Sequence, residues 1–285
     1  MITCRLFLII WWEDKMSQEN KGKLAFFLSS LRDVFPFFFS MGRKSKKTKI
    51  FFMVSLLPVV IALIIKLNQF FSERTAIQGI YIFDNMTIAI YLQFLILILA
   101  LFYGTSVCSE EVEGKTLTYL TTRPISKSAL IVGKYAAYTS LIIIMTSAGV
   151  ILSFFILNLN NLLDFSLYRI LLRDVVVLSL GLMCYTAFFT FIGTIMKKSI
   201  LFGLIFSFGW ENVIQYFPGS TQRFAIIHYL KSLLPVPRTG RFSFLMFRLE
   251  PSPPLFAVFM IFLIIGVFLG LACLLFSWKE YIFED

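Results

Sequence analysis

The feature that most constrains this chain is a series of long apolar segments with almost no charge. Residues 85–109 and 251–277 contain no Asp, Glu, Lys or Arg. A helix of about 20 mostly apolar residues crosses the ~30 Å hydrocarbon core of a bilayer. Strands of a membrane barrel are shorter and alternate apolar with polar residues, so they do not fit. These segments predict helices that span a membrane.

The composition excludes the common soluble classes. Hydrophobic residues make up 58% of the 285 residues and charged residues 15%, against about 25% charged residues in an average soluble domain. A soluble globule cannot bury that much apolar surface, which excludes a cytosolic enzyme. A disordered protein and a disulfide scaffold are excluded as well. Cys108, Cys184 and Cys273 lie in or beside apolar segments and are expected to be buried packing residues.

We therefore predict an all-α, polytopic membrane protein with six spans. They lie at about 50–71, 86–108, 135–159, 175–196, 199–217 and 253–278. Lys and Arg favour the cytoplasmic side, and the densest basic cluster, 43–49, precedes the first span. Both termini are accordingly predicted in the cytoplasm, with the chain in the plasma (inner) membrane of the cell. The basic residues of 219–250 oppose this orientation. The net charge of +10 is assigned to topology and anionic lipid rather than to nucleic acid.

Two further segments are amphipathic. Apolar residues at helical spacing in 24–40 predict an interfacial helix on the cytoplasmic side, with a bend at Pro36. In 221–234 the apolar residues largely share one face, which predicts an outer interfacial helix between spans five and six. Arg223 and Lys231 fall off that face.

The chain is thus divided into an N-terminal segment, 1–40, and a six-span domain, 41–285. A start at Met41 stays open as an alternative.

Nothing in the sequence predicts an enzyme. The single histidine, His228, has no partner pattern and is expected to be a surface or packing residue. The motifs H-E-x-x-H and G-x-S-x-G are absent, and so is an acidic metal cluster. Because G-x-x-x-x-G-K-[ST] is also absent, any ATP that drives this protein must be bound by another polypeptide. No catalytic residue, cofactor or metal is predicted.

The most informative polar segment is 109–135, SEEVEGKTLTYLTTRPISKSALIVGKY. Its glutamates continue the second span into water, and Pro124 stops any helix. Ser126 is placed to cap a new helix that leads into the third span. A short, partly apolar element is therefore expected between two membrane helices. It is either a solvated loop with helix caps or a docking surface for a cytoplasmic partner.

This segment resembles the first cytoplasmic loop of ABC-2-type transporter permeases. Those commonly read E-x-x-x-G-T-L-E-x-L-L-x-x-P-I-S-R-x-x-x-x-x-G-K. Two residues depart from the pattern. Lys115 intrudes between the Gly and the Thr, and Thr118 stands where the family usually has Glu. A weaker second patch, 210–233, is similar to the exit of the fifth span in one branch of these permeases. The residues that match the loop pattern are Glu110 or Glu111, Gly114, Thr116, Leu117, Leu120, Pro124, Ile125, Ser126, Lys127, Gly133 and Lys134.

The resemblance implies six spans, cytoplasmic termini and an interfacial elbow helix. It also implies that two permease subunits, alike or different, pair in the bilayer with two separate ATP-binding cassette ATPase subunits. The function implied is transport of an unknown substrate, as an exporter, without a nucleotide site in this chain. The loop would carry a coupling helix that docks on the ATPase, formed by Glu110, Glu111, Glu113, Gly114, Thr116, Leu117, Leu120, Pro124, Ile125 and Ser126.

Glu211 is the only acid expected well inside a span. It lies about two-thirds of the way along the predicted fifth span. It is either a gate or a contact to substrate or a partner helix, or a structural acid that caps a break at Gly209–Trp210 or pairs with Arg223. A stand-alone secondary transporter or channel, and an accessory membrane subunit, remain as alternatives. A secondary transporter is expected to carry several such groups, broken helices or repeats.

Overall fold

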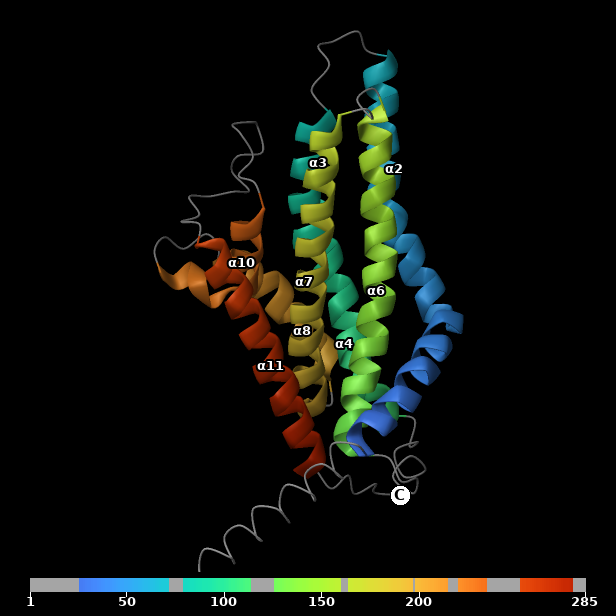
Figure 1. Cartoon of the computed structure of the whole chain (residues 1–285), viewed down its shortest axis with the longest axis vertical. Helices are drawn as coiled ribbons and strands as arrows, with labels where there is room; N and C mark the ends of the chain where they lie inside the picture. The colour runs from blue at the N-terminus through green and yellow to red at the C-terminus, as the bar shows by residue number, and fades with distance from the viewer. Residues whose placement is uncertain are drawn as a thin grey trace, which may run out of the picture.

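The computed structural model describes residues 26–71, 79–113, 126–159, 164–196, 198–214, 220–234 and 252–278, and it contains no strand among them. Figure 1 shows long helices running side by side along the long axis of the molecule. Five helical segments are long and apolar enough to span a membrane. A shorter apolar helix, Ser199–Ile214, corresponds to the predicted fifth span. The all-α, membrane-spanning fold is therefore confirmed, with five long segments and one short one among the described residues.

The first span is formed by one helix and the second by three joined elements. The first span is α2, Lys46–Phe71. The second is continuous but changes its winding: α3, Gly79–Met86, passes into the π-helix η1, Thr87–Leu95, and then into α4, Ile96–Glu113. A π-helical stretch inside an α-helix is uncommon and is frequently found at functional sites.

The remaining helices complete the bundle. Two long helices, α6 (Lys127–Leu157) and α7 (Phe165–Ile195), lie beside α4. The short span consists of α8, η3 and α9, and the 3-10 helix η4 and helix α10 follow it. The last span is α11, Pro254–Trp278. The bounds of the short elements are Ser199–Ile205 for α8, Phe206–Glu211 for η3, Asn212–Ile214 for α9, Ser220–Phe224 for η4 and Ile226–Leu233 for α10.

Three helices begin earlier than hydropathy predicts. The second span starts at Gly79 rather than about residue 86, α6 at Lys127 rather than 135, and α7 at Phe165 rather than 175. Hydropathy detects only the apolar part of a helix, whereas capping carries the helix into polar surroundings. Asp164 caps α7 by accepting a hydrogen bond from the backbone N–H of Ser166 at 3.2 Å.

The centre of the bundle is the α4–α7 pair, which packs through small residues. A Cβ added to Gly104 would lie 2.7 Å from Phe189 Cβ and 2.9 Å from the backbone oxygen of Thr186. Small residues allow helix backbones to approach this closely in a membrane. By contrast, only 17% of the most apolar 18-residue stretch is buried inside the protein in α2 and in α11, whereas 67% of the corresponding stretch is buried in Gly79–Cys108. These two helices are therefore peripheral and expose apolar side chains.

An N-terminal helix occupies residues 26–44 and lies across the end of the bundle where α2 begins (Figure 1). It passes through Pro36 without ending there. Val34 and Phe38 are buried against Leu130 and Ala137 of α6. The prediction of an apolar face on this helix is partly confirmed, because Phe38 is buried but Leu28 is exposed.

The segment between α9 and α11 is more buried than expected. The single amphipathic helix predicted over 221–234 is divided by Ala225, whose backbone is extended, into η4 and α10. Helix α10 packs against α7 and α11. Lys231, which was expected on a polar face, is 4% exposed. His228 is buried too, and its Nε2 lies 3.0 Å from Ser252 Oγ, so it is a packing residue.

Candidate functional site

The predicted coupling segment is described only at its two ends. Helix α4 ends at Glu113, so Glu110, Glu111 and Glu113 belong to its last turn. At the other end, Ser126 caps α6 by accepting a hydrogen bond from the backbone N–H of Ala129 at 3.2 Å, as predicted. Between the ends, the residues that lie outside the described part are Gly114, Thr116, Leu117, Leu120, Pro124 and Ile125.

The last turns of α4 are tied to the start of α2. Lys47 Nζ donates a hydrogen bond to the backbone oxygen of Phe102 at 3.1 Å and another to Ser106 Oγ. The Tyr103 hydroxyl donates to Thr48 Oγ1 at 2.8 Å. The three α4 residues involved lie within about three turns of the end of that helix. These hydrogen bonds hold the start of α2 against α4.

The first turns of α6 are tied to the N-terminal helix. A Cβ added to Gly133 would lie 2.6 Å from Val34 Cγ1, so the two helices touch at this glycine. The next residue of α6 is Lys134. Its Nζ lies 5.2 Å from the centre of the Phe38 ring, one turn beyond Val34, and 5.6 Å from that of Tyr138. Gly133 and Lys134 end the family-like motif. Their contact with the N-terminal helix is a role that the sequence did not indicate.

We predict that Gly133→Ala destabilises the protein. The new Cβ meets the branched side chain of Val34, which has little rotamer freedom, and overpacking of this kind costs about 1–3 kcal/mol. Gly266→Ala in α11 is the matched control, because a Cβ there has no atom within 4 Å. Thermal unfolding in detergent checks this, and Val34→Ala should restore part of the loss. An equal effect of both glycine substitutions would contradict the packing argument.

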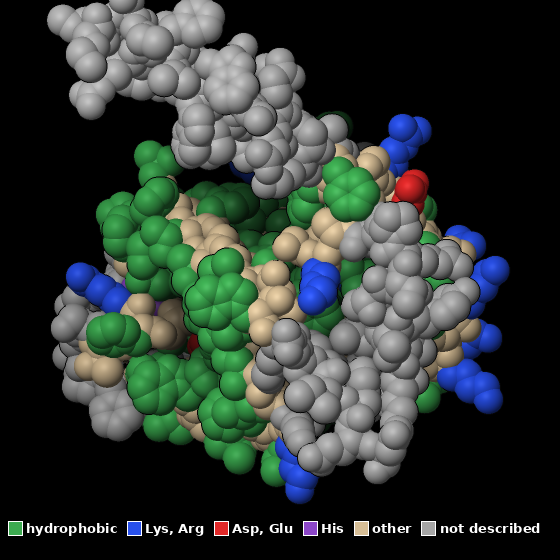
Figure 2. Space-filling model, turned by 90° about the horizontal axis from the view of Figure 1, so that it is seen from below, with side chains coloured by type: hydrophobic (Ala, Val, Ile, Leu, Met, Phe, Trp, Pro, Cys, Tyr) green, Lys and Arg blue, Asp and Glu red, His purple; other side chains and the backbone are tan. Residues whose placement is uncertain are grey.

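Basic side chains surround the same end of the bundle. Arg43, Lys44, Lys46 and Lys49 are exposed there. Figure 2 looks onto this end and shows Lys and Arg along the edge that carries the N-terminal helix and the start of α2. Such a cluster is typical of the cytoplasmic side of a membrane protein.

Glu211 binds the N-terminus of α10. Its side chain is fully buried, and its Oε1 accepts a hydrogen bond from the backbone N–H of Ile226 at 3.1 Å. Its Oε2 accepts one from Ile227 at 3.3 Å. A carboxylate is stabilised at a helix N-terminus by the free N–H groups and by the helix dipole. The two structural alternatives predicted, a cap of Gly209–Trp210 and a pair with Arg223, are therefore wrong, because the acid caps a helix 15 residues further along.

A buried cation accompanies this carboxylate. Burial lowers the pKa of Lys231 to about 8, and the nearby Glu211 opposes that shift. The hydroxyl of Tyr185 is also close to Glu211, although it does not meet hydrogen-bond geometry. Glu211 and Lys231 thus form a buried group of opposite charges that holds α10 against η3. Sequence reasoning missed Lys231 because its neighbours in space come from other segments.

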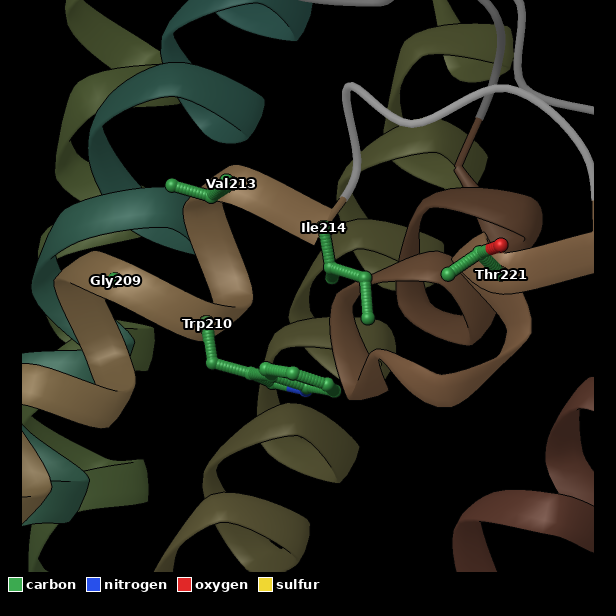
Figure 3. Close-up of a pocket in the computed structure, with 5 residues that line it drawn as sticks. All are labelled: Gly209, Trp210, Val213, Ile214 and Thr221. Carbon is green, nitrogen blue, oxygen red and sulfur yellow. The ribbon is translucent and has the colours of Figure 1, made fainter.

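A cavity of about 360 Å³ opens beside this group. It is lined by Gly209, Trp210, Val213, Ile214 and Thr221 (Figure 3). Trp210 and Val213 are half exposed, so the cavity lies on the outer face of the helix rather than around the buried acid. None of the lining residues is ionisable. The cavity offers an apolar surface but no catalytic group.

Two acids besides Glu211 lie in helices that are long and apolar enough to span a membrane. Asp84 lies in the candidate span Gly79–Cys108, and Asp174 lies in Phe165–Ile195. Both were placed just outside the predicted spans, because α3 and α7 begin earlier than their apolar parts. Asp174 is 1% exposed.

Comparison with known proteins agrees with the family resemblance. A family model for ABC-2 family transporter proteins matches residues 43–210. No curated protein matches the chain. The matched residues run from the start of α2 to η3 and include both helices that flank the coupling segment. Because the match covers more than half of the 285 residues, this chain belongs to the ABC-2 family of membrane transport proteins.

Proposed function

We propose that this chain is the permease subunit of an ABC exporter, driven by ATP hydrolysis in a separate ATP-binding cassette subunit. The ATPase docks on residues 110–126. Docking uses the acidic end of α4, the apolar side chains Leu117 and Leu120, and the capped start of α6. The permease belongs to a family of transport components, and its sequence holds no phosphate-binding loop of its own.

One observation carries this proposal: the helices that flank the segment are tied to two consecutive elements, α4 to α2 and α6 to the N-terminal helix. Lys47 and Thr48 hold α4, while Val34 and Phe38 hold α6. Displacement of residues 114–125 by the bound ATPase therefore moves α4, α6, the N-terminal helix and α2 together. Movement of this kind can change access to a path between subunits. Nucleotide binding shifts the equilibrium only by its differential affinity for the two states.

The assembly we propose contains two permease chains, alike or different, and two ATPase subunits in the inner membrane of the cell. Both termini lie in the cytoplasm. The permease domain extends beyond the family match, over 41–285, because α11 packs on α6 and α7. The N-terminal helix is its elbow, which rests on α6 at the cytoplasmic end.

A stand-alone secondary transporter is the second candidate. Its support is the presence of Asp84, Asp174 and Glu211 within apolar helices, together with two π-helical stretches. Intramembrane acids and interrupted helices are typical of transporters that use ion gradients.

Co-expression separates the two candidates. The tagged chain is purified with an ATP-binding subunit encoded in the same genome, and ATP hydrolysis is measured after reconstitution into liposomes. We expect a stable complex whose ATPase rate depends on the permease. Substrate movement by the permease alone, driven by an ion gradient and without nucleotide, would replace the first candidate with the second.

A further inference from the structure

A second group of polar residues lies between the second and fourth spans. It contains Asp84 on α3, which is half-buried, with Thr87 at the start of η1 and Asp174 on α7, which are buried. Thr87 and Asp174 are each 1% exposed. Arg173 donates to Asp174 Oδ1 from both Nε and Nη2, at 3.3 Å each. The group is separate from Glu211 and from the coupling segment.

Three oxygen atoms of this group are buried without a hydrogen-bond partner among the described residues. They are Asp84 Oδ1, Thr87 Oγ1 and Asp174 Oδ2. Thr87 and Asp174 are neighbours, because the Thr87 hydroxyl lies beside the Asp174 carboxylate, although it does not meet hydrogen-bond geometry. Asp84 is close enough to act electrostatically on Asp174. Buried polar atoms are normally satisfied, and an unsatisfied carboxylate oxygen in an apolar setting is costly. The two unsatisfied carboxylate oxygens therefore favour a ligand with positive charge at this position.

The local charges support the same conclusion. Arg173 is the cation that acts on both Asp84 and Asp174, so two carboxylates share one guanidinium. Cations on neighbouring elements are engaged elsewhere or point outward. Lys66 of α2 donates to the backbone oxygen of Leu157, and Lys231 of α10 acts on Glu211. Arg169 of α7 is exposed.

Within the described residues, then, the group lacks one positive charge. Glu211 provides the contrast, because both of its oxygens accept backbone hydrogen bonds.

We propose that Asp84, Thr87 and Asp174 bind one sodium ion between α3–η1 and α7. Carboxylate and hydroxyl oxygens are the ligands of hard cations. The cation joins the second span to the fourth at the residue where α3 changes to the π-helix η1. Its binding stabilises this arrangement of the two spans.

The test is thermal unfolding of the full chain in detergent at constant ionic strength. NaCl is compared with choline chloride at pH 8 and at pH 5.5. Sodium binding predicts that NaCl raises the unfolding temperature by about 5 °C at pH 8 and by less at pH 5.5, where protons compete. An unfolding temperature that rises on acidification by the same amount in both salts would show protonation rather than sodium binding and would contradict the proposal.

Asp84→Asn should abolish the sodium effect. Thr87→Val, which nearly keeps the shape of the side chain, should weaken it. The matched control is Asp33→Asn on the exposed face of the N-terminal helix, which should leave the effect intact. The proposal is overturned if sodium does not stabilise the wild-type chain, if Asp84→Asn responds as the wild type does, or if only divalent cations stabilise it.

Discussion

We expect Leu117→Asp to separate this chain from the proposed ATPase subunit while leaving it inserted in the membrane. Residue 117 lies in the polar segment between two spans, so the substitution does not disturb an apolar helix. In the proposed complex the Leu117 side chain is buried in a groove of the ATPase, and an unpaired carboxylate there is costly to desolvate. We expect the amount of ATP-binding subunit retained on the purified permease to fall about tenfold or more. Glu113→Lys should act in the same direction by reversing a charge.

The matched control is Thr118→Glu, which adds the same charge at the next residue. Family members commonly carry Glu at this position, so the ATPase should stay bound. The measurements are the ratio of the two subunits after affinity purification and the ATPase rate in liposomes. Normal retention and normal transport-linked ATPase activity in both Leu117→Asp and Glu113→Lys would refute the docking assignment.

Glu211→Ala is expected to cause the largest loss of stability among single substitutions in the membrane domain. It leaves the backbone N–H groups of Ile226 and Ile227 without acceptors, although both residues are buried. It also removes the carboxylate that acts on the buried Lys231. Breaking a buried charge group in this way costs about 3–5 kcal/mol. The unfolding temperature in detergent measures the loss.

Two further variants distinguish the contributions. Glu211→Gln keeps one acceptor oxygen for α10 and should lose less stability than Glu211→Ala. Adding Lys231→Met to Glu211→Gln removes the uncompensated cation, so the double variant should be more stable than Glu211→Gln alone. If Glu211→Ala unfolds at the wild-type temperature but stops transport, Glu211 is a gate or a substrate contact rather than a structural acid.

The pH dependence of these variants follows from Lys231. Its pKa is lowered from 10.5 to about 8 in the folded protein, so the unfolded chain binds more protons between these values. The free energy of unfolding therefore rises with pH between about 8 and 10.5, where Lys231 is neutral in the folded protein but still charged in the unfolded chain. Below about pH 8 Lys231 is charged in both states, and this contribution is absent. Glu211 raises the pKa of Lys231, and its removal should extend the rise to lower pH. Unfolding temperatures at pH 7 and pH 9 should accordingly differ more in Glu211→Gln than in the wild type.

Much of the architecture could be predicted because it depends on local patterns. The apolar segment 251–277 identifies α11, since no other structure hides an uncharged run of that length. Ser126 is a helix cap because its hydroxyl reaches a backbone N–H three residues away. The loop pattern around Gly114 identifies the family, and the match over 43–210 agrees with it.

The sequence by itself determined the spans, the family and one helix start, because each is encoded by neighbours along the chain. Only the tertiary structure decided what the buried polar residues contact. Glu211 meets the N-terminus of α10, Gly133 meets Val34, and Asp84 meets Asp174 across two helices. In an apolar medium a polar atom must find its partner within the protein, and that partner comes from whichever helix packs alongside. The order of residues along one helix carries no record of which helix that is.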